Sequence, residues 1–414
     1  MKNIILAQRK ERDSLLVRQY IMRQSKYDIH ELLSNTLIKL ITGPRRVGKS
    51  VYALLMLKDS NFAYLNFDDK QLLDNWNENI VMATLDEVYA NYDFLLLDEV
   101  QNLTGWDLWV SKLYRRGTNL VITGSNAKML SSEMATVLTG RYIQIEMLPF
   151  SLAETLRWHG IDMEEPSTGR QAQATVLIDN YLHEGGFPET LPARSIAHNY
   201  LNTLFDSILL KDVSQRHRIR NTRDLYNLAN YLLSNFCNPF TYSDITGELG
   251  FTSVATVKKF CDYLHEPYLF FYLPRYNNKL KLMKKAAQKV YIVDNGFVQS
   301  SAFNLSENLG RLLENQIFIE LLRRGYDVEK SIFYYRSRND REVDFVLREG
   351  TAVKQLIQVC YDMSQPKTRK RELSALTECA EELKCDKLTI VTYNQEETIE
   401  QNGYTIHLLP ITKF

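Results

Sequence analysis

The chain has 414 residues, enough for about two to four domains. Its 50 basic and 50 acidic side chains cancel, so contact with nucleic acid would have to come from a local basic patch. The five cysteines show no paired metal-ligand spacing, charges follow the short apolar start too soon for a signal peptide, and no apolar run could span a membrane. We expect a cytoplasmic protein with reduced thiols and no membrane contact.

Apolar runs alternate with longer helical patterns in the first 150 residues. This alternation predicts an α/β fold with a parallel sheet that is covered on both faces. The expected strands are 37–42, 62–67, 93–98, 119–124 and 142–147.

A candidate phosphate-binding loop follows the first expected strand. The loop consists of Gly43, Pro44, Arg45, Arg46, Val47, Gly48, Lys49 and Ser50. This order fits G-x-x-x-x-G-K-[ST], in which backbone N–H groups and the N-terminus of the next helix surround phosphate oxygens. We expect Lys49 to pair with the β- and γ-phosphates of ATP and Ser50 to hold Mg²⁺. The alternative is a glycine-rich turn that fits by chance.

The strand at 93–98 ends in Asp98 and Glu99, as a Walker B strand does. We expect Asp98 to hold Mg²⁺ through water and Glu99 to orient or deprotonate the attacking water. The alternative is a strand that runs into an acidic loop.

Two later positions resemble functional positions of AAA+ ATPases. Thr123, Ser125 and Asn126 end the fourth strand at a place that resembles sensor 1, and Asn126 is favoured over Ser125. Either could instead cap a helix. Arg141 precedes the fifth strand and resembles an arginine finger, which reaches a neighbouring subunit's nucleotide and stabilises charge in phosphoryl transfer. A surface or structural arginine is the alternative.

Together, "ITGPRRVGKS", "LLLDEVQ", "ITGSNAKML", "LTGRY" and "LPFSLAE" resemble the bacterial and archaeal AAA-type ATPases that carry a C-terminal DUF4143 domain. The resemblance covers nearly the whole chain. It implies an ATPase of the archaeal-ATPase and STAND-like branch, in which ATP turnover works as a conformational switch.

The middle of the chain resembles a lid. Gly186-Phe187-Pro188 is similar to the lid motif of STAND ATPases, in which the proline packs against adenine. A helix stop followed by a turn is the alternative. The helical segment 209–221 carries three arginines, one of which could act as sensor 2, and the sequence does not choose among them.

Residues 241–276 read as helix, turn, helix and strand, which is the pattern of a winged helix. Six cations follow in the expected wing, with no acid between Glu266 and Asp294, and Tyr272 and Tyr276 lie nearby. This composition suits contact with duplex DNA. Packing against a partner domain is the alternative. The six cations are Arg275, Lys279, Lys281, Lys284, Lys285 and Lys289.

The last hundred residues resemble the PD-(D/E)XK nuclease fold. Active members hold Mg²⁺ with a Glu, an Asp and an (E/Q)-x-K element. The matching residues here are Glu314, Asp344 and Gln358, but Cys360 stands where the lysine belongs. A thiol cannot offer a fixed cation, and nothing in the sequence supports a lysine supplied from 354, 367 or 370. We expect an inactive nuclease-like domain.

The expected fold is an AAA+-type P-loop core with a helical lid, a winged helix and a PD-(D/E)XK nuclease-like C-terminal domain. The expected bounds are 1–168 for an N-terminal helix plus the core, 169–235 for the lid, 236–305 for the winged helix and 306–414 for the nuclease-like domain.

The expected function is a slow Mg-ATP hydrolase that acts as a switch on a protein partner or on itself. A DNA-stimulated ATPase that uses the winged helix is the alternative, and an ATP-regulated, Mg²⁺-dependent nuclease is less favoured.

Overall fold

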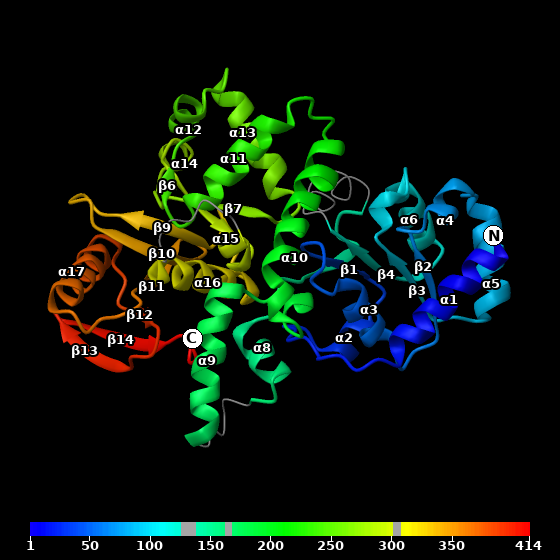
Figure 1. Ribbon diagram of the computed structural model, residues 1–414, viewed down its shortest axis with the longest axis horizontal. Helices are drawn as coiled ribbons and strands as arrows, with labels where there is room; N and C mark the ends of the chain where they lie inside the picture. The colour runs from blue at the N-terminus through cyan, green and yellow to red at the C-terminus, as the bar shows by residue number, and fades with distance from the viewer. Residues whose placement is uncertain (126–137, 162–167, 301–307) are drawn as a thin grey trace. The chain divides into compact units, whose positions relative to one another are not determined.

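The computed structural model describes residues 1–125, 138–161, 168–300 and 308–414 (Figure 1). These residues form two compact units. The first unit comprises Met1–Leu148 with Glu266–Tyr268, and the second unit comprises Pro149–His265 with Leu269–Phe414. None of the helices in the described ranges combines the length and the apolar character that a membrane span requires.

The first unit is built on a parallel sheet in the order β2-β3-β4-β1-β5, and all five predicted strands are found. Its strands are β1 (Ile38–Thr42), β2 (Phe62–Asn66), β3 (Phe94–Asp98), β4 (Asn119–Gly124) and β5 (Tyr142–Glu146). Because β4 lies between β1 and β3, the carboxyl ends of these three strands meet at one edge of the sheet. Ligands of open α/β sheets bind at this edge.

Helices lie on both sides of the sheet of the first unit (Figure 1). They are α1 (Lys2–Leu16), α2 (Ile29–Ser34), α3 (Lys49–Leu57), α4 (Lys70–Asp74), α5 (Glu78–Tyr89), the 3₁₀ turn η1 (Val100–Asn102) and α6 (Trp106–Arg115). The side chain of Asn77 caps α5 by accepting from the Ile80 N–H, which satisfies one of the free donors at that helix end.

The second unit begins with a mostly helical middle region. Its elements are α8 (Leu152–Trp158), α9 (Thr168–Glu184), η3 (Pro188–Thr190), α10 (Arg194–Ser207), the π-helix η4 (Ile208–Gln215), α11 (Thr222–Ser234), α12 (Tyr242–Leu249), α13 (Val254–His265), α14 (Leu280–Met283) and α15 (Gly296–Ser300). A small antiparallel sheet in the order β6-β8-β7 joins them, with β6 (Pro239–Phe240), β7 (Phe270–Pro274) and β8 (Gln288–Ile292). The predicted helix–turn–helix is present as α12 and α13, and Gly250 ends α12 in the left-handed conformation.

The predicted basic wing is wrong at two of its six positions. Lys289 lies on β8 and is buried, and the half-buried Arg275 donates to the carbonyl of Arg336. The two nearby tyrosines also use their hydroxyls inside the protein, Tyr272 on the carbonyl of Cys261 and Tyr276 on the side chain of Asn278. The exposed cations of this segment are Lys279, Lys281, Lys284 and Lys285.

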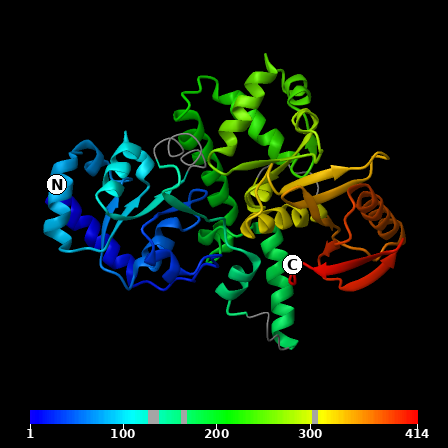
Figure 2. The same ribbon diagram turned by 180° about the vertical axis from the view of Figure 1, so that it is seen from behind.

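The second unit ends in a six-stranded mixed sheet that follows α16 (Leu309–Arg323). The other elements are β9 (Ile332–Arg336), β10 (Glu342–Glu349), β11 (Ala352–Val359), α17 (Pro366–Leu383), β12 (Leu388–Thr392), β13 (Glu397–Gln401) and β14 (Tyr404–Pro410). The order is β13-β14-β12-β11-β10-β9, with β11, β12 and β14 parallel and the remaining pairs antiparallel. Figure 2 shows α17 lying along this sheet, where Leu376 and Cys379 join its buried core.

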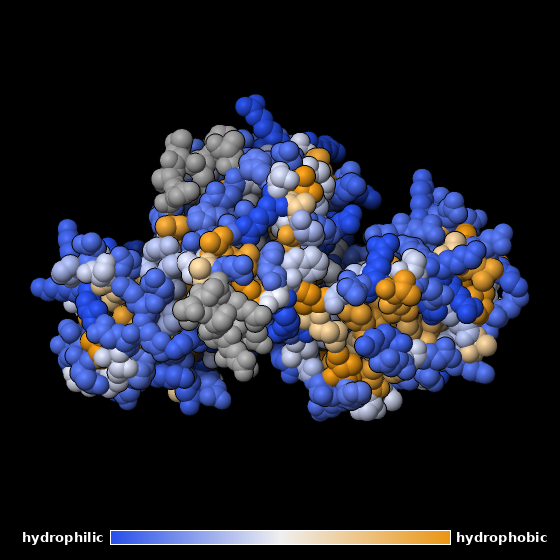
Figure 3. Space-filling view, turned by 60° about the horizontal axis from the view of Figure 1, so that its bottom comes forward, coloured by the Kyte–Doolittle hydropathy of each residue, from blue (hydrophilic) through white to orange (hydrophobic). Residues whose placement is uncertain are grey.

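Apolar surface is unevenly distributed over the face shown in Figure 3. Apolar residues gather in patches on the first unit, whereas the C-terminal sheet region is mostly hydrophilic on this face. The most exposed large apolar side chains of the first unit are Val17 and Leu108. Scattered single exposures of this kind are ordinary in folded proteins.

A buried carboxylate ties the glycine pair of the middle region to α15. Asp294 accepts from the Gly186 N–H at 2.7 Å and from the Gly296 N–H at 2.9 Å. Gly185 has φ +75°, and a Cβ on it would come within 1.6 Å of Asp294 Oδ1. Gly185 therefore has to be a glycine for the backbone to approach this carboxylate, whereas a Cβ on Gly186 of the lid-like motif would come within 2.2 Å of the Phe150 carbonyl oxygen.

We predict that Asp294 makes the stability of the protein depend on pH. Burial raises the pKa of Asp294 to about 7, against the opposing effect of the two backbone N–H donors. Because the pKa in the unfolded chain is lower, the folded state retains a proton that the unfolded state releases. The contribution of this group is therefore greatest below about pH 4 and falls by up to about 1.4 kcal/mol per pH unit as the pH rises toward 7.

Urea unfolding of wild type and Asp294→Asn between these pH values measures the effect. The free energy of unfolding of the variant should fall less steeply with rising pH than that of the wild type. Equal slopes for the two proteins would show that Asp294 titrates as an ordinary carboxyl.

Candidate functional site

The loop between β1 and α3 is shaped by two glycines with positive φ. Gly43 has φ +144°, and a Cβ at this position would come within 1.9 Å of the Met147 carbonyl oxygen. Gly48 has φ +89° and is the N-cap of α3, so Lys49 and Ser50 are the first two residues of the helix. The N-terminus of α3 therefore points its free N–H groups into the loop, as phosphate binding requires.

Lys49 connects the loop to the end of β3. Its side chain is only about 3% exposed, its ammonium donates to the carbonyl of Pro44 at 2.9 Å, and it lies 3.6 Å from Glu99 Oε1. A buried ammonium needs such partners because its desolvation is costly. The geometry places a single positive charge between the predicted phosphate site and the predicted catalytic carboxylate.

Asp98 is buried at the end of β3 among three hydroxyl groups. Oδ1 accepts from Ser50 Oγ at 2.8 Å and also from Thr123 Oγ1, and Oδ2 accepts from the Tyr64 hydroxyl at 3.2 Å. Burial and the neighbouring Glu99 raise the pKa of Asp98 to about 6, while the three hydrogen bonds act in the opposite direction. The adjoining hydroxyl of Ser50 and carboxylate of Asp98 are hard oxygen donors, which is the chemistry that Mg²⁺ prefers.

Glu99 is held by its backbone and by its side chain. Its φ of +52° and ψ of 43° are left-handed, an uncommon conformation for a residue other than glycine. Its N–H donates to Thr123 Oγ1 at 2.9 Å, and the Gln101 amide donates to its carboxylate. Burial would raise the pKa of Glu99, but Lys49, Gln101 and Arg45 outweigh it, so the pKa lies below its ordinary value. The carboxylate is therefore ionised at neutral pH and can accept a proton.

Sequence reasoning missed the structural roles of Thr123, Tyr64 and Gln101. Thr123 is fully buried and binds both Asp98 and the backbone of Glu99, and Gln101 also reaches Ser125 Oγ at 3.3 Å. The available signal was the neighbouring register of β3 and β4, in which Leu97 pairs with Ile122. A polar residue one step beyond that pair had to lie beside Asp98.

Three further predicted residues of the nucleotide site are Arg141, Asn126 and Pro188. The Arg141 guanidinium lies over the Tyr114 ring of the same chain, 5.8 Å from its centroid. Asn126 lies outside the described residues. Pro188 begins η3 in the second unit.

The predicted nuclease-like residues do come together in the second unit. Glu314 and Asp344 each accept from the Lys289 ammonium at 2.9 Å, and Gln358 Oε1 accepts from the Asp344 N–H at 3.3 Å. Glu342 also binds Lys289, at 2.7 Å. A lysine from 354, 367 or 370 had no support in the sequence, and the lysine found in this cluster is Lys289 of β8. Cys360 donates instead to the Asp362 carbonyl at 3.4 Å.

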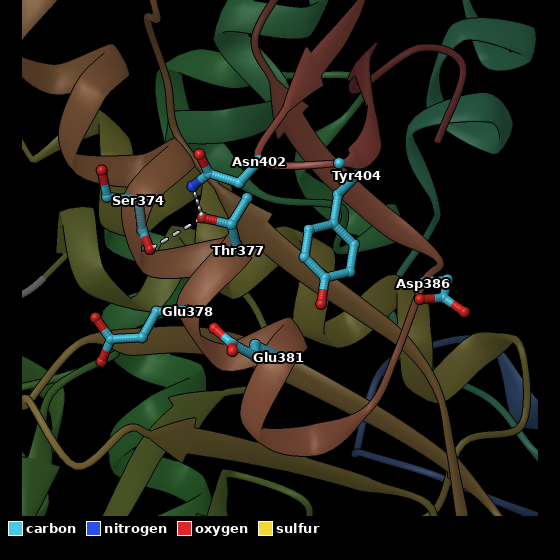
Figure 4. A pocket seen from close by; sticks show the side chains of 8 residues that line it. Ser374, Thr377, Glu378, Glu381, Asp386, Asn402 and Tyr404 are labelled. Carbon is cyan, nitrogen blue, oxygen red and sulfur yellow. Dashed lines mark hydrogen bonds between the residues drawn. The ribbon is translucent and has the colours of Figure 1, made fainter.

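A separate hollow of about 670 Å³ lies over α17 and the turn between β13 and β14 (Figure 4). Glu378, Glu381 and Asp386 give it an acidic lining, and Asn402 donates to Thr377 at 3.3 Å. None of the predicted site residues lines it. Within the described ranges, no group of three or more His, Cys, Asp or Glu side chains is arranged to hold a metal ion.

We predict that Thr123→Val slows ATP turnover more than it weakens nucleotide binding. The substitution keeps the shape of the side chain but removes a hydrogen bond from Asp98 and leaves the Glu99 N–H without its acceptor, at a cost of about 1–3 kcal/mol. Thr123→Ser, which retains the hydroxyl, is the matched control. Phosphate release and fluorescent-nucleotide binding measure the two effects, and unchanged turnover in Thr123→Val would remove this residue from the site.

Three sequence families match the chain along most of its length. Residues 35–156 match an AAA domain (AAA_14), residues 175–308 match a domain of unknown function (DUF8612), and residues 309–414 match a second domain of unknown function (DUF4143).

Two relatives and one solved structure are similar to the chain. An uncharacterised protein of Methanocaldococcus jannaschii is 33% identical over 407 residues, covering 94% of this chain and 90% of the relative. An uncharacterised protein of Haemophilus influenzae is 32% identical over 351 residues, covering 79% and 83%. A Walker-type ATPase of Pyrococcus abyssi aligns with a TM-score of 0.42 at 16% identity, over 69% of this chain and 99% of that one, a likeness too low to bear on function.

The loop, the two carboxylates at the end of β3 and the parallel sheet all lie within the residues that match the AAA domain. The chain belongs to the family of AAA-type P-loop ATPases that carry a DUF8612 region and a C-terminal DUF4143 domain.

Proposed function

We propose that the chain binds Mg-ATP in the first unit, hydrolyses it slowly, and uses the nucleotide as a conformational switch. The observation that carries this proposal is the contact of Lys49 with both the Pro44 carbonyl and Glu99. Because one lysine contacts both the loop and the proposed catalytic carboxylate, a phosphate that binds this lysine would change the surroundings of both.

Each residue has a role that follows from its chemistry. The loop N–H groups and Lys49 bind the β- and γ-phosphates, and Ser50 and Asp98 would hold Mg²⁺. A bound Mg²⁺ supplies positive charge that stabilises the phosphates as they react. Glu99 orients the attacking water and accepts its proton, since its carboxylate is ionised at neutral pH. Thr123 keeps Asp98 and Glu99 in fixed positions.

The switch follows from competition for Lys49. Phosphate oxygens carry more charge than the carboxylate of Glu99, so bound ATP takes the ammonium from Glu99. The carboxylate then retains the Gln101 amide and becomes free to meet water. Glu99 precedes η1, which leads into α6, so a movement of Glu99 would shift these elements at the surface of the first unit. A protein partner or a second copy of the chain would bind the shifted surface.

We predict different defects for the two charged residues of the site. Glu99→Gln keeps the side chain's shape and should still bind Mg-ATP, but its turnover should fall about 10²- to 10⁴-fold because it lacks a base. Lys49→Ala should lose both binding and turnover. Phosphate release and nucleotide binding are measured beside Lys58→Ala, whose exposed lysine ends the same helix and should have no effect. Wild-type turnover in Glu99→Gln would reject the role of Glu99.

DNA-stimulated turnover is the second candidate function, and exposed cations support it. Lys279, Lys281, Lys284 and Lys285 are exposed around α14, and Lys258 and Lys259 are exposed on α13. Lysines on the second helix of a helix–turn–helix and on the following segment are positioned as phosphate contacts in winged-helix proteins. This placement supports the proposal that the middle region is a winged helix that contacts duplex DNA.

We predict that replacing the four lysines at 279, 281, 284 and 285 by glutamine weakens duplex binding. Each lost phosphate contact should lower the slope of log K against log salt by about 0.9. Fluorescence anisotropy across a salt series measures this slope. The matched control replaces four exposed lysines of the C-terminal domain, at 367, 370, 384 and 387. Equal binding by wild type and both variants would leave only the protein-partner switch.

The element order of the C-terminal domain supports a nuclease-like fold. A helix is followed by three antiparallel strands, a second helix and a strand that pairs in parallel with the third. Glu314 lies on α16, Asp344 on β10 and Gln358 on β11, which supports the proposal.

A further inference from the structure

Lys289 is among the most deeply buried charged side chains of the described residues. It is 1% exposed on β8, and its ammonium lies 2.9 Å from Glu314 Oε1, 2.7 Å from Glu342 Oε1 and 2.9 Å from Asp344 Oδ1. The three carboxylates come from α16 and from β10, which belong to the matched DUF4143 domain. The lysine comes from the matched DUF8612 region.

The hydrogen-bonding capacity of this ammonium is fully used. A lysine ammonium has three N–H donors, and each of the three carboxylates here accepts one. Burial acts against the charged form, but Asp344, Glu314 and Glu342 outweigh it and keep the pKa of Lys289 well above its ordinary value. The side chain is therefore a cation held by three carboxyl groups.

The carboxylates and the amide of the cluster are committed to protein partners as well. Asp344 Oδ2 accepts from the Val359 N–H at 2.9 Å, and Gln358 Nε2 donates to Glu372 at 2.9 Å. The Tyr291 hydroxyl donates to Glu314 at 2.7 Å. The Arg336 guanidinium donates to Glu342 Oε2 at 3.0 Å. The oxygens that a nuclease would turn toward a metal are turned toward the protein.

These residues do not fit a divalent metal ion. Mg²⁺ requires near-octahedral oxygens at about 2.0–2.1 Å and several retained waters. The Lys289 ammonium, within hydrogen-bond distance of all three carboxylates, occupies the position between them that a metal ion would need, and it repels a second cation. The metal that the nuclease-like resemblance implies therefore conflicts with the arrangement of the side chains.

We infer that the ammonium of Lys289 takes the place of the metal ion in the nuclease-like domain and fastens β8 to α16 and β10. The domain then serves as a fixed structural partner of the middle region and does not cut DNA in a metal-dependent way. This inference does not rest on ATP hydrolysis, and either proposal can fail without the other. A lysine that assists an active nuclease is the competing reading, and the experiments distinguish the two.

The first experiment counts Mn²⁺ bound by the full chain without nucleotide, using the electron paramagnetic resonance of free Mn²⁺. All variants carry Asp98→Asn, which removes the carboxylate expected to hold metal in the first unit. We expect no Mn²⁺ at the cluster while Lys289 is present. Lys289→Ala should gain one bound ion, and Asp344→Asn should remove it. An ion bound in the presence of Lys289 and lost with Asp344→Asn would overturn the inference.

The second experiment follows thermal unfolding, because Lys289→Ala leaves three carboxylates without their counter-ion. We expect a lower Tm than in Lys387→Ala, which removes an exposed lysine of the C-terminal domain that carries the three carboxylates. Adding Mn²⁺, or combining Lys289→Ala with Glu342→Gln and Asp344→Asn, should restore it. If Lys289→Ala does not fold at all, the same two treatments should restore a folded protein. An unchanged Tm, or a defect that neither treatment repairs, would show that Lys289 is not the counter-ion.

The third experiment incubates the wild-type chain with supercoiled plasmid and Mg²⁺ or Mn²⁺, beside Asp344→Asn. We expect equal and negligible cutting by the two proteins. Cutting by the wild type that Asp344→Asn abolishes would identify Lys289 as part of an active nuclease and reject the structural role.

Discussion

The nucleotide site depends on one buried carboxylate, Asp98, and on the hydroxyls that surround it. Ser50 comes from the helix after the loop, Tyr64 from β2 and Thr123 from β4, so three different elements meet on one side chain. A carboxylate buried without such donors would be protonated. The parallel strand order makes the meeting possible, because it brings the ends of neighbouring strands to one edge. Through these contacts Ser50, at the end of the loop, and Thr123, which also accepts from the Glu99 N–H, are held beside the same carboxylate.

Much of this site could be predicted from the sequence because its signals are local. The loop is a run of eight residues, Asp98 and Glu99 end an apolar strand, and the strands are largely apolar runs. Thr123 was noted only as a small polar residue, since its two contacts depend on the pairing of β3 with β4. The left-handed backbone of Glu99 carries no sequence signal, because glutamate rarely adopts it.

Lys289 could not be predicted for a different physical reason. In the sequence it ends a run of lysines with no acid nearby, and such a run usually lies in solvent. Its partners Glu314, Glu342 and Asp344 are far along the chain, and they reach it only because α16 and β10 fold against β8. In this buried position, the attraction between the Lys289 ammonium and its carboxylates outweighs the loss of its hydration. The sequence shows Cys360 where active members have a lysine, but only the tertiary structure brings Lys289 to this cluster.

The C-terminal sheet has an edge at β13, and the side chains on this strand affect whether two molecules can join edge to edge. Glu397 and Glu400 lie on β13, which is largely exposed. The guanidinium of Arg369, on α17, donates two hydrogen bonds to the Glu397 carboxylate, at 2.7 and 2.8 Å. An unpaired strand edge is a template onto which a strand of another molecule can add. Arg369 balances the charge of Glu397, so Glu400 is the carboxylate of the two that would repel an identical strand added at this edge.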